Sequence, residues 1–262
     1  MNEIGIYTDS GYTMVYGKIY GGKKAFVMLP GVSLTSVLNS IDAIEDGYKA
    51  FLDEYTIYVF DNCAKVLEGD SIEIEADRDI KLFDHLNIKD AYVLATSHGG
   101  MIAQVVASKR PDLIQKLILA SSCMKTNEKR VEVLKKWEKM ALNYEIENIN
   151  RDFYERLFSK EFYLKNIDIL KPTFKNGTKE ECDNFAKMLR TMYDVDISNF
   201  TKCIKNNTLV IGASEDCIFG KDASIEIAST IPCDVYIYEG YCHAVYDEAI
   251  DYKDRITTFY KD

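Results

Sequence analysis

Residues 91–101, with the sequence AYVLATSHGGM, decide the fold expected for this chain. An apolar, β-prone run ends in the polar, glycine-rich turn 96–100, and an apolar helical pattern follows that turn. A serine between a strand and a helix, with a small residue two positions before it and another two positions after it, is typical of a nucleophile elbow. Ala95 and Gly99 are the small residues here. Ser97 is therefore the candidate nucleophile.

The composition indicates a globular protein and argues against two classes of partner. The chain has 262 residues, of which 47% are hydrophobic and 28% charged, as is ordinary for a soluble globular protein. The formal net charge of −10 argues against a nucleic-acid-binding surface, which needs clustered Lys and Arg, and against docking on anionic membranes. The sequence does not indicate an oligomeric state.

The N-terminal residues, the length of the apolar runs and the cysteines together favour a cytoplasmic location. The N-terminal residues have neither a basic start nor an apolar core, so we expect no signal peptide, and no apolar run approaches the length of a membrane span. The seven cysteines are odd in number and include no CxxC pair, which favours reduced thiols over a disulfide framework. We therefore expect a cytoplasmic protein.

Apolar runs bounded by turn residues predict strands buried on both faces of a parallel sheet. The predicted strands are residues 14–19 (in a hairpin), 24–29, 56–60, 92–95, 117–120, 208–211 and 235–238. Helical patterns separate them, at residues 41–55, 71–86, 101–110 (stopped by Pro111) and 247–260. This alternation predicts an α/β fold with a mainly parallel central sheet flanked by helices on both faces.

Between residues 123 and 200 the pattern changes. Strand-like runs give way to amphipathic helical patterns with a dense aromatic group that includes Trp137, Phe153, Tyr154, Phe158 and Tyr163. These rings either form the core of the helical segment or line an apolar substrate pocket, and their spacing does not separate the alternatives. We predict an α/β core of residues 1–122 and 201–262, with residues 123–200 inserted as a helical unit.

Four segments resemble, in chain order, the motifs of the α/β-hydrolase superfamily. They are the turn LPGV at 29–32, the elbow ATSHGG at 95–100, the segment VIGASED at 210–216 and the turn GYCHA at 240–244. The resemblance covers nearly the whole chain outside the helical unit, and it implies the α/β-hydrolase fold with that unit as a cap inserted after the sixth strand. The chain departs from the superfamily in having Ala95 for the commoner Gly, no His before Gly31, and Phe219-Gly220 where a proline is usual.

The resemblance implies a triad of Ser97, Asp216 and His243, in the superfamily's order of serine, acid and histidine. A serine hydroxyl attacks well only when a base accepts its proton, and His243 lies in the loop after a predicted strand, where parallel sheets place their sites. We expect His98, as the neighbour of Ser97 in sequence, to project elsewhere, with its imidazole packed against the cap, and His85 to lie on the surface.

Asp216 is expected to orient His243 and to stabilise its charged form. Its competitors are Glu215, Asp222 and Asp247. Some members of the superfamily carry the acid after the sixth strand, but residues 120–123 include no carboxylate.

The oxyanion hole implied by the resemblance consists of the backbone N–H groups of Val32 and His98, and the Ser33 hydroxyl is a candidate for an additional donor. No metal or organic cofactor is required by this apparatus. We expect Cys217 and Cys242 to lie near each other if the triad forms, as packing residues rather than as ligands of zinc.

These assignments predict a cap-bearing serine hydrolase, similar to carboxylesterases and lipases, that cleaves an ester-like bond of a small, partly apolar substrate through an acyl-enzyme. Carbon–carbon bond hydrolysis, peptidase action and acyl transfer on the same triad remain alternatives. So does a receptor that uses the hydrolase pocket to bind a ligand without turnover, since fold does not determine function. The substrate-binding residues do not follow from the sequence.

Overall fold

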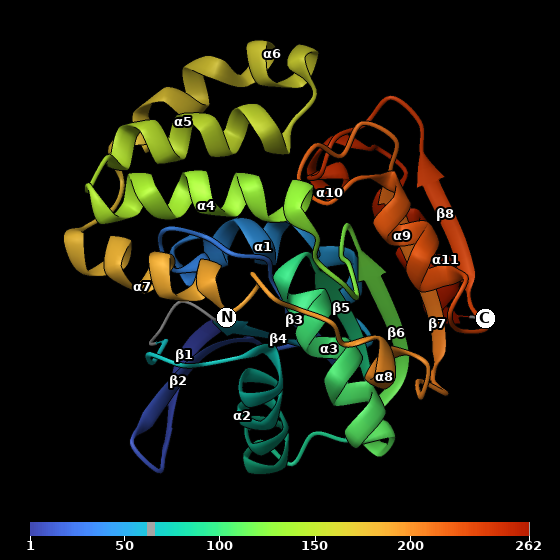
Figure 1. Ribbon diagram of the computed structural model, residues 1–262. Coiled ribbons are helices and arrows are strands. Elements are labelled where there is room, and N and C mark those ends of the chain that lie inside the picture. The colour runs from blue at the N-terminus through green and yellow to red at the C-terminus, as the bar shows by residue number, and fades with distance from the viewer. Residues whose placement is uncertain (62–65, 262) are drawn as a thin grey trace.

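The structure of the protein, a computed structural model, describes residues 1–61 and 66–261. Within these residues a single sheet of eight strands forms the centre of the molecule (Figure 1). The strands are β1 (Asn2–Asp9), β2 (Tyr12–Ile19), β3 (Lys24–Leu29), β4 (Tyr55–Asp61), β5 (Ala91–Thr96), β6 (Ile114–Ala120), β7 (Asn207–Ala213) and β8 (Asp234–Tyr238).

The strand order is β1-β2-β4-β3-β5-β6-β7-β8. β1 and β2 form an antiparallel hairpin, β2 pairs antiparallel with β4, and all pairs from β4 to β8 are parallel. The prediction of a mainly parallel sheet is therefore confirmed. The register pairs Leu29 with Ala95, so the turn after β3 and the turn after β5 emerge side by side.

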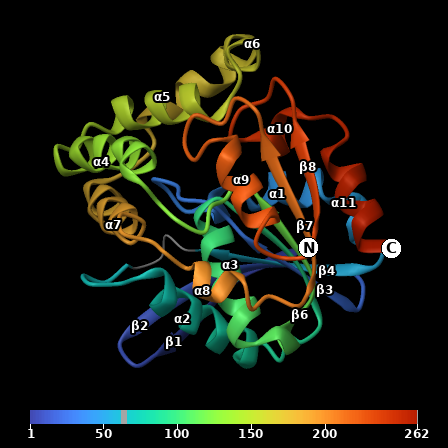
Figure 2. The ribbon, with the colours of Figure 1, turned by 45° about the vertical axis from the view of Figure 1, so that its right-hand side comes forward.

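Helices cover both faces of the sheet (Figures 1 and 2). One buried cluster joins the sheet to α2 (Ile72–His85), α3 (His98–Lys109) and α9 (Lys221–Ala228). A second cluster joins the other face to the segment around α1 (Ile41–Gly47) and to α11 (Tyr252–Lys261). These two layers are what the near-continuous apolar strands require, because each strand must bury both of its faces.

Two predicted helices are shorter in the structure than in the sequence pattern. Residues 41–55 form α1 followed by the 3₁₀ turn Lys49–Phe51 rather than one helix. The C-terminal pattern is divided into α10 (Val245–Glu248) and α11, because Ala249 has an extended backbone with ψ 119°. In both segments the apolar residues keep helical spacing across the interruption, which is why the pattern does not reveal the break.

The chain between β6 and β7 contains a helical insertion above the carboxyl ends of the strands (Figure 1). Its helices are α4 (Glu128–Leu142), α5 (Ile146–Leu157), α6 (Lys160–Leu170) and α7 (Lys179–Arg190), and α8 (Ser198–Thr201) leads back to the sheet. The insertion after the sixth strand is thus confirmed, while the boundaries at 123 and 200 stay a prediction. Among the described residues, none of the helices combines the length and the apolar character needed to cross a membrane.

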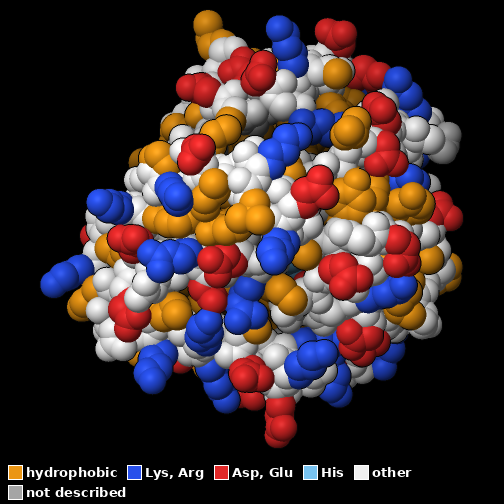
Figure 3. Space-filling view, turned by 90° about the horizontal axis from the view of Figure 1, so that it is seen from above, with side chains coloured by type: hydrophobic (Ala, Val, Ile, Leu, Met, Phe, Trp, Pro, Cys, Tyr) orange, Lys and Arg blue, Asp and Glu red, His pale blue; other side chains and the backbone are white. Residues whose placement is uncertain are grey.

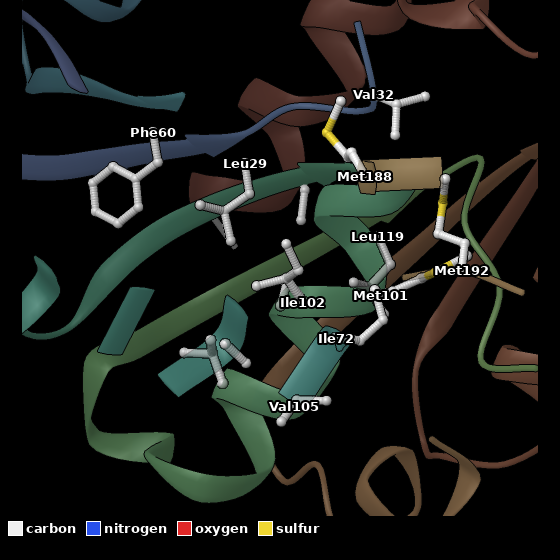
Figure 4. Close-up of a cluster of buried hydrophobic side chains, with 14 of the residues drawn as sticks. Leu29, Val32, Phe60, Ile72, Met101, Ile102, Val105, Leu119, Met188 and Met192 are labelled. Atoms are coloured by element: carbon white, nitrogen blue, oxygen red, sulfur yellow. The ribbon is translucent and has the colours of Figure 1, made fainter. Parts of the chain in front are cut away.

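The outer face of the insertion is polar and mixed in charge. Seen from above, Lys and Arg side chains lie among Asp and Glu, and hydrophobic side chains form groups between them (Figure 3). Its inner face is apolar: Met188 and Met192 lie over the start of α3 beside Met101 and Val32 (Figure 4). The insertion therefore closes the carboxyl end of the sheet with an apolar layer.

One buried arginine ties the insertion to the α/β core. Arg130 of α4 is only 3% exposed; its guanidinium donates to the carbonyl oxygens of Phe219 (2.8 Å) and Lys125 (2.6 Å). The same group pairs with Asp222 at 2.8 Å and Glu226 at 3.1 Å, both on α9. A planar group with five donors suits this arrangement, since it satisfies two carbonyls and two carboxylates at once.

We expect Arg130→Met to lower the free energy of unfolding by about 2–4 kcal/mol, because two carbonyl oxygens lose charge-assisted hydrogen bonds. Urea denaturation monitored by circular dichroism measures this change. Lys129→Met, at the exposed neighbouring position, is the matched control and should change stability little. Equal stability of the two variants would contradict the role assigned to Arg130.

Candidate active site

Ser97 occupies a strained turn between β5 and α3. Its φ of 54° and ψ of −120° lie outside the regions that L-residues ordinarily adopt. Gly99 makes the turn possible, because a Cβ at this position would lie 2.1 Å from the carbonyl oxygen of Leu29. The small residues that flank Ser97 thus allow α3 to approach β3, as the sequence pattern predicts.

His243 and Asp216 form a buried pair. Nδ1 of His243 lies 2.8 Å from Oδ2 of Asp216, and their side chains are 2% and 3% exposed. Asp216 follows β7, and His243 follows β8, so two adjacent parallel strands deliver the pair to the carboxyl end of the sheet. The other carboxylate oxygen of Asp216 accepts hydrogen bonds from the backbone N–H groups of Ile218 (2.8 Å) and Phe219 (3.1 Å).

The surroundings of Asp216 keep it ionised. Burial is the largest influence and acts to raise the pKa of this carboxyl group, but the charge of His243, its hydrogen bond and the two backbone donors outweigh burial. The pKa of Asp216 is therefore lowered from its ordinary value of 3.8. Phe219 supplies one of these backbone donors, and it lies where the superfamily usually has a proline. Its ring packs edge-on against the imidazole of His243, with ring centroids 5.5 Å apart.

Of the carboxylates that compete for this position in the sequence, only Asp216 contacts His243 in the structure. Glu215 and Asp247 are exposed. Asp222 pairs with Arg130 instead. Glu215 and Asp216 both lie in the turn that follows β7, but Asp216 is 8% exposed and only its neighbour Glu215 faces solvent.

The turn after β3 lies against the elbow. A Cβ at Gly31 would meet Cβ of Ser97 at 3.0 Å, and the N–H of Gly99 donates to the carbonyl of Pro30 at 3.1 Å. Among the described residues, the backbone N–H groups of Val32 and His98 donate to no acceptor, so both remain available to a ligand. The hydroxyl of Ser33 instead donates to the carbonyl of Thr35 at 2.7 Å.

The side chain of His98 contacts residues that its position in the sequence does not indicate. It is fully buried, and its Nε2 lies 2.8 Å from Oε2 of Glu75 on α2 and 3.4 Å from Oγ1 of Thr191, just after α7. The expected contact with the insertion is present through Thr191, but the close partner is a carboxylate of the core. His85 is exposed, as predicted, and stacks on Tyr7 with ring centroids 4.6 Å apart.

Two serines after β6 brace the turns that carry the site, and the sequence gives no sign of this role. Ser121 Oγ donates to the carbonyl of His243 at 2.7 Å, and Ser122 Oγ donates to the carbonyl of Ser97 at 2.8 Å. Both serines are 1% exposed. In the sequence, residues 121 and 122 matter only because neither is a carboxylate that could serve as the acid. In the structure, their hydroxyls hold the elbow and the histidine loop in place.

Ser97 and His243 line one small cavity. Gly31 and Val32 line it from the core, and the remaining lining is apolar and comes mainly from the insertion, including Trp137 and Phe153. Its volume of about 20 Å³ is room for about one water molecule. The aromatic residues therefore belong both to the core of the insertion and to the pocket lining: Trp137 is 1% exposed within the insertion and also borders the cavity.

Cys217 and Cys242 flank the buried pair as free thiols. Burial, followed by the influence of Cys217, raises the pKa of Cys242 to about 11. Cys217 donates through Sγ to the carbonyl of Arg156 at 3.3 Å. Within the described part of the chain, no group of three or more His, Cys, Asp or Glu residues has an arrangement that could hold a metal ion.

Comparison with known proteins identifies the family. The family model described as alpha/beta hydrolase fold matches residues 68–250, which include the elbow, Asp216 and His243. The chain belongs to the α/β hydrolase fold family. The resemblance of its motifs and the order of its strands thus have the same explanation.

Solved structures of this fold match nearly the whole chain at low sequence identity. An α/β hydrolase from a Medee basin deep-sea metagenome library has a TM-score of 0.85 and 19% identity, with 98% of each chain covered. The enol-lactonase from Burkholderia xenovorans LB400 has a TM-score of 0.84 and 16% identity, covering 98% of this chain and 100% of its own. An esterase from Exiguobacterium antarcticum has a TM-score of 0.79 and 15% identity, with 95% and 96% covered.

A curated relative from Serratia proteamaculans (strain 568), named as a carbamate hydrolase, RutD, is 22% identical over 169 residues. The match covers 64% of this chain and 63% of the relative. At these identities the structural likeness shows the fold alone, and the α/β hydrolase fold supports a hydrolase as the general class.

One turn after Glu75, α2 carries a second buried carboxyl group, and its burial leads to a prediction about stability. Asp79 is 2% exposed, and its Oδ2 has no hydrogen-bond partner among the described residues. Burial and then the charge of Glu75 raise the pKa of Asp79 well above its ordinary value of 3.8. The stability that this group contributes is therefore fully present below about pH 3.8 and is lost as the pH rises through the raised value.

Asp79→Asn removes this titration and should reduce the loss of stability as the pH rises above about 3.8. Denaturant unfolding over a series of pH values above that point measures the difference. Asp77→Asn, an exposed change on the same helix, is the control. If wild type and Asp79→Asn lose stability in parallel, Asp79 does not titrate in this range.

Proposed function

We propose that the protein is a serine hydrolase, similar to carboxylesterases, that cleaves an ester-like bond through an acyl-enzyme. One observation carries the proposal: His243, which is paired with the buried Asp216, borders the same cavity as the strained Ser97. A histidine held by a carboxylate beside a serine is the arrangement that activates a hydroxyl for attack on a carbonyl.

In this mechanism the hydroxyl oxygen of Ser97 attacks the substrate carbonyl, and His243 accepts the hydroxyl proton. Asp216 holds Nδ1 of His243 and stabilises the imidazolium; it remains ionised because its pKa is lowered. The imidazolium then protonates the leaving group, which departs and leaves the acyl group on Ser97. A water molecule, deprotonated by His243, releases the acid in the second half of the reaction.

The N–H groups of Val32 and His98 stabilise the negative charge on the tetrahedral intermediate. Their lack of an acceptor supports this role, since donors already bonded within the protein would not be free for the oxyanion. The His98 donor also belongs to the first turn of α3, where the helix dipole favours negative charge. A donor of this kind typically contributes about 3 kcal/mol to the transition state.

The named relatives support the type of bond. An esterase, an enol-lactonase and a carbamate hydrolase are among the proteins that this chain is similar to, and each name denotes cleavage of an acyl bond to oxygen or nitrogen. We therefore propose an ester-like substrate rather than cleavage of a carbon–carbon or peptide bond. Free thiols at all six described cysteines support the cytoplasm as the location.

Ser97→Ala should abolish labelling by a fluorophosphonate probe and lower kcat for p-nitrophenyl acetate by about 10⁴-fold or more, because the acyl-enzyme cannot form. Ser229→Ala, at an exposed position, is the control. A wild-type protein that is neither labelled nor active on p-nitrophenyl esters would rule out the hydrolase and favour a receptor without turnover.

Asp216→Asn should lower kcat by about 10⁴-fold, because the wrong tautomer of His243 is then favoured. Glu215→Gln, the exposed neighbour, should have little effect. Equal kcat for the two variants would contradict the role assigned to Asp216.

A further inference from the structure

A second, larger hollow lies outside the cavity at Ser97. It has a volume of about 620 Å³ and opens between the loop that follows β3 and the helices of the insertion. Phe153 of α5 lines both spaces and so stands between them. We propose that this outer hollow binds a neutral, hydroxyl-rich alcohol, such as a polyol or sugar, whose short acyl ester is cleaved at Ser97; this inference rests on the proposed function.

The two volumes indicate that the inner cavity holds the acyl group of the substrate and that the outer hollow holds its alcohol. The acyl group stays on Ser97 after the first step, so it must fit the inner cavity, whose 20 Å³ and apolar walls suit only a short chain. The alcohol must leave the site, and the outer hollow provides about 30 times that space (620 against 20 Å³). A substrate with a bulky acyl group would have to displace the buried side chains of the insertion.

The outer hollow is lined by hydrogen-bonding side chains, which distinguishes it from the apolar inner cavity. Asn39 and Ser40 are exposed, and their side chains make no hydrogen bond with the described residues. The amide nitrogen of Asn150 donates to the carbonyl oxygens of Phe174 and Asn176 at 3.0 and 2.9 Å. This leaves the Oδ1 of Asn150 as an acceptor, which matches the hydroxyl donors of a polyol.

The charges of the lining favour a neutral ligand. Its two ionisable side chains, Lys175 and Glu181, are opposite in sign, so the hollow presents no net charge to an anion or a cation. Aromatic rings complete the wall. Tyr154 is fixed by stacking on Phe158 and Phe174, with centroids about 6 Å apart, and offers an apolar face with a polar edge. Alternating ring faces and hydrogen-bonding groups suit the C–H and O–H surfaces of a polyol.

Matched esters test the inference on the intact protein. Glycerol 1-acetate and n-butyl acetate share the acyl group and differ in the hydroxyls of the alcohol, and we expect kcat/KM to be about tenfold higher or more for the glycerol ester, since each hydroxyl gains a hydrogen bond. Asn39→Ala combined with Ser40→Ala should reduce this ratio by about three- to tenfold. Asn199→Ala, an exposed asparagine on α8 outside the hollow, should leave the ratio unchanged.

A second variant tests the partition. Phe153→Ala joins the two spaces and should raise kcat/KM for p-nitrophenyl hexanoate relative to p-nitrophenyl acetate by about tenfold or more, because a longer acyl chain gains room. Phe162→Ala, a half-buried ring of α6 that lines neither space, is its control.

The outcomes separate this inference from the proposed function. If fluorophosphonate labels Ser97 and p-nitrophenyl acetate is hydrolysed, but the glycerol ester is not preferred or the Asn39/Ser40 variant keeps the ratio, the hollow is not the alcohol site. A preference for an acetyl ester of an anionic alcohol, such as O-acetylglycolate, over glycerol 1-acetate would also overturn the assignment of a neutral ligand. Absence of both labelling and hydrolysis would instead contradict the proposed function itself.

Discussion

The close approach of α3 to the end of β3 is the constraint on which the rest of the site depends. Leu29 pairs with Ala95 in the sheet, and the backbone of Gly99 lies where any Cβ would collide with the carbonyl oxygen of Leu29. This contact brings the turn after β3 against Ser97, where the N–H groups of Val32 and His98 find no acceptor among the described residues. The positive φ of Ser97 is tolerated because its backbone is held on both sides: its N–H donates to Ala120, and its carbonyl accepts from Ser122.

The histidine and its acid depend on the same edge of the sheet. Neighbouring strands β7 and β8 end side by side, which places Asp216 and His243 within a hydrogen bond although 27 residues separate them in sequence. Ser121, just after β6, donates a hydrogen bond to the backbone carbonyl of His243. Parallel strands therefore act as a common platform, and each functional side chain stands on the turn that follows its strand.

The insertion converts this open edge into two spaces of different character. Arg130 ties α4 to the loop after Asp216, so the insertion and the acid turn are linked by charge-assisted bonds. Phe153 then divides the space beneath the insertion into an apolar inner cavity and a polar outer hollow. The outer hollow is lined by the insertion together with the loop that follows β3.

The sequence by itself determined where the strands of the core and the elbow lie along the chain, because both leave local signals: buried strands are continuous apolar runs, and a strained turn needs small residues at fixed offsets. It also indicated Asp216 and His243, through motifs at the ends of strands. Tertiary structure alone decided the partner of His98 in Glu75, the bracing by Ser121 and Ser122, and the partition at Phe153. Those contacts join residues far apart in the chain, such as 121 and 243, and depend on the direction in which each side chain points, so no local pattern records them.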